Sequence, residues 1–481
     1  MNIPKWIEVG MAMGKRVVAK SVGKRLCAAL VVCALLVPAA VWTQIISGDE
    51  RDEDAAPVPS FSRAGNEARV NIDRPKPVFL LAERAPRIHG LAPFQTLVDA
   101  AAPGSVLRPP PGVYAGPVTI DKSLTIEGGG AVVIDAGDKG TVMTLEANDS
   151  TVRGLRLTGS GESHDTDDTC LNVRGHRNTI ENLEIDSCLF GIDLKQADRN
   201  IVRGNRIRSK ELALGMRGDG LRLWYSNDNL IEANEIVDSR DVVVWYAHHN
   251  VFRANIGRRS RYSIHFMFAN DNLVENNRFF DNAVGIYFMF VRGGAARGNL
   301  ISHASGATGM GIGLKESSET VVENNEVVYC GIGIGSDLSP FEPGSSIEIR
   351  GNRFAYNGVA IQFNSETGGN NVRGNIFEGN LIQVSYGGRS ENPERNFWEG
   401  NYWDDYEGFD RDHDGQGDTP HEIYAYADRI WMEFPMASFF RDSPVLELLD
   451  FLERLAPFSA PDLILRDAKP RFTKPERKAG P

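Results

Sequence analysis

The chain has 481 residues, of which 24% are charged and 9% aromatic, a composition typical of folded rather than disordered proteins. Its formal net charge of −12 excludes a nucleic-acid-binding role, which requires a basic footprint. The 49 glycines favour an architecture with many tight turns.

The N-terminal segment has the layout of an export signal. Basic residues between Lys15 and Arg25 precede an apolar, charge-free run over residues 26–42. The same run is just long enough for a membrane anchor. Residues 1–46 are therefore predicted to be a cleaved signal peptide or an anchor, and both interpretations export the rest of the chain. Residues 47–88, rich in Asp, Glu, Pro and Ser, are predicted to form a flexible linker.

One short pattern recurs along the chain from residue 152: an apolar residue, two small or polar residues, Asn, any residue, and another apolar residue. Its asparagines are 21 to 29 residues apart, and a period of this length is typical of solenoid proteins. The asparagines are Asn205, Asn234, Asn255, Asn277, Asn299, Asn325, Asn352 and Asn375.

Each repeat contains short stretches rich in β-branched residues, such as residues 191–194 and 331–334, and leaves no room for a pair of helices. The sequence therefore predicts an all-β fold, a parallel β-helix of roughly 10–13 coils over residues 89–400. Coils of parallel strands stack every ~4.8 Å, so equivalent residues form columns. The repeated asparagines are predicted to form a buried ladder in which each amide bonds the next coil, a purely structural role.

The two ends of a β-helix expose strand edges and need caps. Residues 93–102 are predicted to form a short amphipathic helix at the N-terminal end. At the other end, residues 423–481 are predicted to form a cap and tail. Within it, residues 444–455 place their apolar side chains on one helical face.

Three cysteines lie beyond the apolar N-terminal run, so they can form at most one disulfide bond. Cys188 and Cys330 occupy the same column six coils apart, which at ~4.8 Å per coil is far beyond disulfide reach. A bond between Cys170 and Cys188 stays open.

An acidic loop within residues 401–422 has the spacing of a calcium-binding loop. Three aspartates stand at loop positions 1, 3 and 5, and Gly415 stands at position 6, where the sharp turn requires glycine. Position 12 is His421, so the following glutamate has to supply the last carboxylate. The loop is predicted to hold a structural Ca²⁺ that pins the C-terminal cap, and the alternative is a solvated acidic turn. The predicted ligands are Asp410, Asp412, Asp414, Gln416, Asp418 and Glu422.

A second set of candidate residues emerges when the repeats are aligned on their asparagines. Strand alternation directs Ile264 and Phe266 inward, so their neighbours in the same strand point outward. Apolar patches on an outer face usually mark binding sites, and thioether with imidazole suits Cu(I). Three interpretations stay open: packing under a loop, a surface for a partner protein or a sugar ring, and direct copper contact. The residues are Trp224, Trp245, His265, Met267, Tyr287 and Met289.

A third cluster, residues 164–168, contains three aspartates and a histidine, and Arg217, Asp219 and Arg222 follow two coils later. Polysaccharide lyases and epimerases use clustered carboxylates beside a β-helix for proton abstraction. A simple polar loop is the favoured interpretation, because motif-like clusters often arise by accident.

Several segments together resemble one family. They are residues 400–406 (GNYWDDY), 409–420 (FDRDHDGQGDTP) and 443–452 (SPVLELLDFL), together with 265–267 (HFM) and 288–290 (FMF). Their succession is similar to the NosD family, and the resemblance extends from about residue 91 to 472.

The resemblance implies a right-handed β-helix in the periplasm that takes part in maturation of the copper sites of nitrous oxide reductase. It further implies an ABC transporter membrane subunit as a partner, together with a copper chaperone or the reductase itself. Copper would be a transient ligand, calcium a structural one, and the protein itself would not be an enzyme. The alternative function is a carbohydrate-active enzyme, a polysaccharide lyase or epimerase.

Overall fold

The computed structural model describes residues 90–306, 309–364, 368–387, 396–425 and 462–476. The predicted signal or anchor, the predicted linker and the predicted helix over residues 444–455 lie outside these ranges. No helix within the described residues has the length and apolarity needed to cross a membrane.

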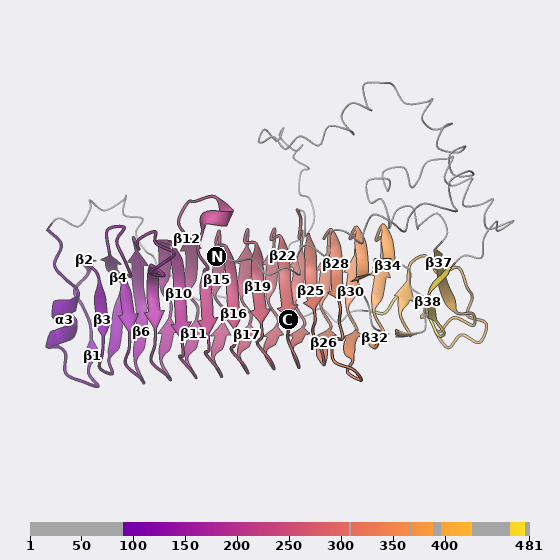
Figure 1. The fold of residues 1–481 in the computed structure, drawn as a ribbon, viewed down its shortest axis with the longest axis horizontal. Helices are drawn as coiled ribbons and strands as arrows, with labels where there is room; N and C mark the ends of the chain where they lie inside the picture. The colour runs from indigo at the N-terminus through magenta and orange to yellow at the C-terminus, as the bar shows by residue number, and fades with distance from the viewer. Residues whose placement is uncertain (1–89, 307–308, 365–367, 388–395, 426–461, 477–481) are drawn as a thin grey trace, which may run out of the picture. The chain divides into compact units, whose positions relative to one another are not determined.

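The described chain is an all-β solenoid of short parallel strands, as predicted, with about 12 turns (Figure 1). A typical coil contributes two strands to a 24-stranded sheet, called sheet A below, and one strand to a 12-stranded sheet, called sheet B. The strands of sheet B are β3 (Val118–Ile120), β5 (Met143–Leu145), β7 (Thr169–Val173), β10 (Phe190–Lys195), β13 (Leu221–Trp224), β16 (Asp241–Trp245), β19 (Tyr262–Met267), β22 (Val284–Met289), β25 (Met310–Lys315), β28 (Ile332–Asp337), β31 (Val359–Asn364) and β34 (Ile382–Gly387).

Sheet A contains two ladders of strands, one on each side of the repeated asparagine. The first ladder comprises β1 (Val106–Leu107), β4 (Thr125–Asp135), β6 (Thr151–Thr158), β8 (Thr179–Glu181), β11 (Ile201–Arg203), β14 (Leu230–Glu232), β17 (Val251–Arg253), β20 (Leu273–Glu275), β23 (Ala295–Arg297), β26 (Thr320–Glu323), β29 (Ile347–Arg350), β32 (Asn370–Arg373) and β35 (Phe397–Glu399). The second comprises β2 (Gly112–Ala115), β9 (Glu184–Cys188), β12 (Arg206–Ser209), β15 (Glu235–Val237), β18 (Ile256–Arg258), β21 (Arg278–Phe280), β24 (Leu300–Ser302), β27 (Glu326–Val328), β30 (Arg353–Ala355), β33 (Ile376–Glu378) and β36 (Tyr402–Trp403). The long strands β4 and β6 take part in both ladders.

The interior of the coils is filled by the side chains that alternation directs inward. Ile264, Phe266 and Phe288 are at most 2% exposed, and the rings of Phe266 and Phe288 stack with centroids 5.1 Å apart. The corner before each repeated asparagine is made by a residue in the left-handed conformation, for example Gly204 (φ 63°) and Ala233 (φ 53°). Small residues recur there because a bulkier side chain is strained at positive φ.

The repeated asparagines form one buried column. Asn277 is typical: its backbone N–H and its Nδ2 both donate to Oδ1 of Asn299 at 2.9 Å, and Nδ2 also donates to the carbonyl of Phe252 at 2.9 Å. The column begins at Asn205 and continues past Asn375 to Asn401. A second buried ladder, which the sequence analysis missed, consists of Asn178, Asn200, Asn229, Asn250 and Asn272.

Charges alternate in sign along one outer column of sheet A. Neighbours in this column pair in register, so opposite charges lie side by side from coil to coil. Displacing one coil along the strand direction would separate these opposite charges, so the column favours the observed register. The column is Glu127, Arg153, Glu181, Arg203, Glu232, Arg253, Glu275, Arg297, Glu323 and Arg350.

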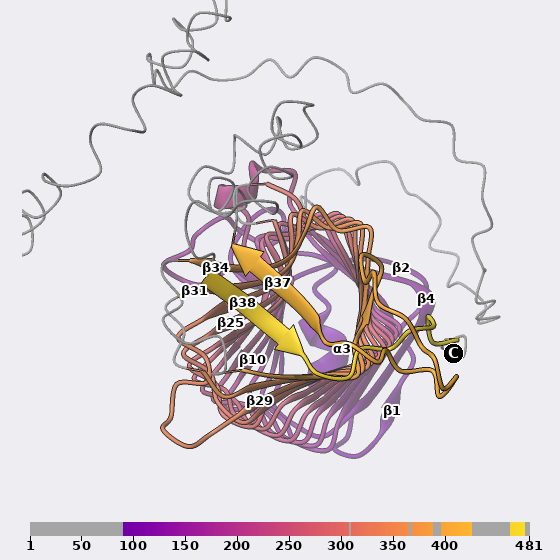
Figure 2. The same cartoon turned by 90° about the vertical axis from the view of Figure 1, so that its right-hand side faces the viewer.

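Both ends of the described β-helix are covered. Helix α3 (Gln95–Ala100) lies at the N-terminal end, within the predicted range 93–102. At the other end, the antiparallel hairpin of β37 (His421–Ala425) and β38 (Asp462–Asp467) lies across the last coils (Figure 2). The short 3₁₀ helix η1 (Leu214–Met216) lies in a loop beside sheet B.

The open cysteine pairing is resolved by the structure. Cys170 and Cys188 form a disulfide bond, with Cα atoms 5.6 Å apart. Cys330 is free and buried, and burial raises the pKa of its thiol to about 11, so it is an inert thiol at neutral pH.

Candidate docking face and metal loop

The outward residues named from the sequence lie on sheet B in adjacent, register-matched strands. Trp224 of β13 pairs with Trp245 of β16, and Trp245 pairs with Met267 of β19. Met267 pairs with Met289 of β22. The parallel register thus places two tryptophans and two methionines in one outer column. Lys195 precedes the column in β10, and Lys315 follows it in β25.

The neighbouring outward column brings His265 beside Tyr287. The imidazole of His265 stacks on the ring of Tyr262, with centroids 4.8 Å apart, and its Nε2 is buried with no hydrogen-bond partner among the described residues. Burial lowers the pKa of His265, so the imidazole is neutral at pH 7. A neutral imidazole is the form that binds metal ions.

Four aromatic residues beside the Trp/Met column were missed by the sequence analysis. Each directly follows a column residue and forms the corner at the end of its sheet B strand. The first three are 36–46% exposed, and the fourth is partly buried. Their signal in the sequence is the repeated pair Trp-Tyr, Trp-Tyr, Met-Phe, Met-Phe. They are Tyr225, Tyr246, Phe268 and Phe290.

These four corner residues all adopt the left-handed conformation, with φ between 49° and 55°. This conformation costs roughly 1–2 kcal/mol for an ordinary L-residue and is unusual for a bulky side chain. In the coil before Tyr225 the same corner position is Gln196, and in the coil after Phe290 it is Glu316. The fold itself therefore does not require an aromatic ring at this position. The same conformation recurs at corners along the whole β-helix, for example at Asp228, Ala254 and Tyr329, so it belongs to the fold and does not by itself mark a site. We call the corner residues and the column together the aromatic stripe: Trp224, Tyr225, Trp245, Tyr246, Met267, Phe268, Met289 and Phe290.

The rings at the corners stack on one another. Tyr225, Tyr246, Phe268 and Phe290 have successive centroid distances of 4.9, 5.3 and 4.7 Å and interplanar angles of 6–11°. Because each inner ring has both faces covered by its neighbours, the stripe presents mainly ring edges to solvent. Stacking of a sugar ring requires an open aromatic face, so this arrangement suits an apolar protein surface better than a carbohydrate.

Of the carboxylates considered for catalysis, Asp167 and Asp168 are held by hydrogen bonds at one end of the stripe, where Asp193 joins the same network. Asp193 is fully buried and accepts two hydrogen bonds from Arg222, at 3.0 and 2.7 Å. Arg222 and Lys195 also donate to Asp167, at 3.0 and 2.8 Å. Asp168 accepts bonds from Ser163 and Thr166 of its own loop. This geometry agrees with the polar-loop interpretation.

Asp219 has the perturbed titration that catalytic acids often show, because burial raises its pKa to about 6. Its carboxylate is only 2% exposed and accepts a 3.0 Å hydrogen bond from Arg240. A polymer chain on the outer surface has no access to a group buried in this way.

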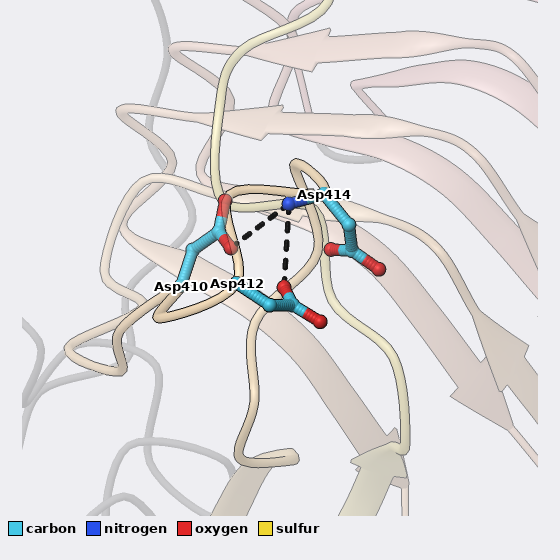
Figure 3. Close-up of side chains that lie close together, drawn as sticks. All are labelled: Asp410, Asp412 and Asp414. Atoms are coloured by element: carbon cyan, nitrogen blue, oxygen red, sulfur yellow. Dashed lines mark hydrogen bonds between the residues drawn. The ribbon is translucent and has the colours of Figure 1, made fainter.

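Three aspartates of the acidic loop come together in the structure. Carboxylate oxygens of Asp410, Asp412 and Asp414 lie within 4.8 Å of one another (Figure 3). The backbone N–H of Asp414 donates to Asp410 and Asp412, at 3.2 and 3.3 Å, and Gly415 N–H donates to Asp410 at 2.9 Å. These are hard oxygen donors of the type that Ca²⁺ prefers.

The other predicted calcium ligands are placed differently. Asp418 accepts a hydrogen bond from the N–H of Arg411 at 2.8 Å. Glu422 lies in β37 and is not part of the aspartate group; it accepts a 2.7 Å bond from the hydroxyl of Tyr424 and lies 3.5 Å from Arg466. Gln416 bonds to Asp414 through its N–H and Nε2, and its backbone forms a bridge with Arg471.

The acidic loop is joined to the end of the β-helix through the segment that follows β38. Gly417 N–H donates to Pro470 O at 2.8 Å, and Phe472 N–H donates to Gly415 O at 3.0 Å. Between them, Arg471 N–H donates to Asn401 O of the last coil at 2.8 Å. The position of the loop is thus coupled to the position of the C-terminal segment.

The fold and the aromatic stripe define a parallel β-helix protein with an apolar outer face. Residues 207–408 match the model of a family described as periplasmic copper-binding protein (NosD). The resemblance seen in the sequence is therefore confirmed over residues 207–408, a range that includes the whole aromatic stripe.

Two curated relatives support this assignment. A probable ABC transporter binding protein NosD of Pseudomonas aeruginosa is 28% identical over 398 residues, which cover 77% of this chain and 89% of the relative. A protein of the same name from Stutzerimonas stutzeri is 31% identical over 131 residues, covering 27% of this chain and 30% of the relative.

Among solved structures, the A-module of the mannuronan C-5 epimerase AlgE6 of Azotobacter vinelandii is 14% identical with a TM-score of 0.48, and the match covers 64% of this chain and 93% of that module. The catalytic domain of a GH87 α-1,3-glucanase complexed with tetrasaccharides is 15% identical with a TM-score of 0.48, covering 62% and 65%. Similarities at this level carry no conclusion about activity.

Proposed function

We propose that this protein is a periplasmic accessory protein for maturation of the copper sites of nitrous oxide reductase, acting as a β-helix scaffold with an ABC transporter. The match to the NosD family model and the names of the relatives support this role. The observation that carries it is the aromatic stripe, a set of partly exposed apolar residues on four consecutive coils.

A binding function fits the outer face of sheet B better than catalysis does. Aromatic residues and methionine are enriched at the centres of protein interfaces, and charged residues surround such centres. The stripe follows this arrangement, with Lys195 paired to Asp167 at one end and Lys315 within 3.8 Å of Asp337 at the other. The nearby carboxylates Asp193, Asp168 and Asp219 are buried and already bonded.

Removing a tryptophan from the stripe is the direct test of docking. Trp224→Ala or Trp245→Ala is expected to weaken binding to the transporter membrane subunit, or to the reductase, by about 2 kcal/mol or more, because tryptophan is a frequent interface anchor. Binding is measured with purified partners, and maturation by the copper content of the reductase from a complemented deletion strain.

Tyr329→Ala is the matched control, since Tyr329 is 53% exposed but lies on another corner column of the β-helix. Asp165→Asn is expected to leave maturation intact. Unsaturated uronate products or C5-epimerised residues formed from polyuronate by the purified protein, and lost in carboxylate variants, would replace the accessory role with the polysaccharide lyase or epimerase alternative.

Copper is proposed as cargo that passes over the same face. Met267 and Met289 offer adjacent thioethers, and His265 offers a neutral imidazole, the soft donors that suit Cu(I). The double substitution Met267→Leu and Met289→Leu keeps side-chain volume and removes sulfur. It is expected to lower Cu(I) retention, measured by competition with a chromogenic chelator, while binding of the partner proteins persists. Unchanged copper retention would leave only the docking role.

Calcium is proposed as a structural ligand of the acidic loop. Asp410, Asp412 and Asp414 would hold the ion, and it would fix the loop to which Arg471 and Phe472 are bonded. A ligand that binds only the folded state raises stability, so added Ca²⁺ is expected to raise the Tm of the parent protein. Asp412→Ala should have a lower Tm with no calcium response. An equal rise in Tm on addition of Ca²⁺ in both proteins would show that the loop is not a calcium site.

A further inference from the structure

The aromatic stripe is uncharged over its whole length and bracketed by lysines. Its two columns span four coils, β13 to β22, and contain only aromatic and methionine side chains. Lys195 and Lys315 occupy the register positions directly before and after the Trp/Met column. The two lysines are five coil steps apart, about 24 Å at ~4.8 Å per coil.

The spacing of the coils is close to the pitch of an α-helix. Coils repeat every ~4.8 Å and helical turns every ~5.4 Å, so the mismatch over the three intervals of the stripe is only about 2 Å. A helix lying along the stacking direction therefore places one apolar residue, at i, i+4 or i+3 spacing, over each coil in turn. The span between the lysines corresponds to a helix of about 16 residues.

We propose that the aromatic stripe binds one amphipathic α-helix of a partner protein, which lies along the coil-stacking direction with its apolar face on the stripe and carboxylates near both ends. This inference rests on the docking function proposed above and names the recognised segment. Lys195 already lies beside Asp167 and Asp193, and Lys315 lies 3.8 Å from Asp337 and directly precedes Glu316. Each ammonium nevertheless has three donors and keeps capacity for a further acceptor.

Other occupants fit the stripe less well. The mutual stacking of the corner rings leaves no run of open faces for sugars. A partner strand has no free edge to join, because the strands from β5 to β31 of sheet B each have a neighbour on both sides. A second copy paired through a two-fold axis is disfavoured in both possible orientations. If the two β-helices run antiparallel, Lys195 faces Lys315 of the other copy. If they run parallel, each lysine faces its own equivalent, so like charges oppose each other in both cases.

The test uses synthetic helical peptides of 18 residues with a leucine face. One peptide carries two glutamates at each end, and its partner carries two lysines at each end instead. The glutamate peptide is expected to bind the full-length protein about three- to tenfold more tightly, the range for two exposed ion pairs. Lys195→Gln combined with Lys315→Gln removes both charges without adding carboxylates beside Asp167 and Asp337, and is expected to abolish this preference. Affinities are measured by isothermal titration calorimetry.

Variants of the corner rings test where the peptide binds. Tyr246→Ala with Phe268→Ala is expected to weaken binding of the glutamate peptide at least tenfold, because these exposed rings lie at the centre of the contact. Tyr329→Ala with Tyr356→Ala removes a stacked and more exposed pair from another corner column and should change nothing. Both double variants remove left-handed aromatic corners, so a general effect of such substitutions would appear in both.

Equal affinity for the two peptides, or binding that survives Tyr246→Ala with Phe268→Ala, would overturn the helix inference. Binding of phosphatidylcholine vesicles through the stripe in place of the peptides would assign the face to a lipid surface. The peptides could fail to bind while Trp245→Ala still lowers the affinity of the protein for the transporter subunit or the reductase. In that case the docking function stands and only the helical partner is wrong. If Trp245→Ala also binds these partners normally, the proposed function fails.

Discussion

Replacing Asp467 with asparagine is expected to lower the free energy of unfolding by about 3 kcal/mol, because each buried N–H group left without its acceptor costs roughly 1–3 kcal/mol. Asp467 is fully buried and terminates the long asparagine ladder. Its Oδ2 accepts bonds from the backbone N–H and Nδ2 of Asn401, at 3.0 and 2.9 Å, and from Nε1 of Trp403 at 3.2 Å. Its Oδ1 accepts the N–H groups of Gly400 and Lys469, both at 3.1 Å.

Both oxygens of Asp467 face only donors in these five bonds, so an amide NH₂ in place of either oxygen meets N–H groups and leaves them unsatisfied. The effect is measured as a shift in the urea midpoint. Asp121→Asn, at an exposed position near the opposite end, is the control and should shift the midpoint little. A small shift for Asp467→Asn would mean that the ladder does not depend on its terminal acceptor.

Acidification is expected to loosen the C-terminal hairpin, because His421 is buried in its neutral form. His421 is 8% exposed and stacks on Trp403 with centroids 4.9 Å apart, and burial lowers its pKa to about 4. The folded state therefore binds fewer protons than the unfolded state between pH 6.5 and about 4. Stability from this residue is present above pH 6.5 and is lost as the pH falls through that window, by up to about 3 kcal/mol.

The nearby carboxylates Asp404, Asp405 and Asp467 favour the protonated imidazole but do not outweigh burial. Asp219 contributes with the opposite sign, because its raised pKa makes the folded state gain stability as the pH falls from about 6 towards 3.8. The effect of His421 is therefore measured locally, as faster hydrogen exchange in β37 and β38. His421→Phe keeps an aromatic ring on Trp403 and should remove the pH dependence. If hydrogen exchange in β37 and β38 still depended on pH in His421→Phe, another titrating group would be responsible.

The sequence alone determined the solenoid and its outward columns. A repeat of 21 to 29 residues with one asparagine in each has one simple physical solution, in which equivalent residues stack and each buried amide finds its partner in the next coil. Strand alternation then placed His265 and Met267 outside and Phe266 inside, as the structure has them. These conclusions need only local periodicity, and parallel stacking carries that periodicity through the β-helix.

The tertiary structure decided what local periodicity does not encode. The corners at the ends of the sheet B strands can be located only from backbone angles in the structure. The structure was therefore needed to add four residues to the candidate site: Tyr225, Tyr246, Phe268 and Phe290. The end of the asparagine ladder was also hidden, because Asp467 lies 66 residues beyond Asn401 and belongs to no repeat. The structure also shows that Asp193, Asp168 and Asp219 are buried and hydrogen-bonded, which identifies them as structural rather than reactive carboxylates. Each of these depends on contacts between segments remote in sequence, which composition and spacing cannot specify.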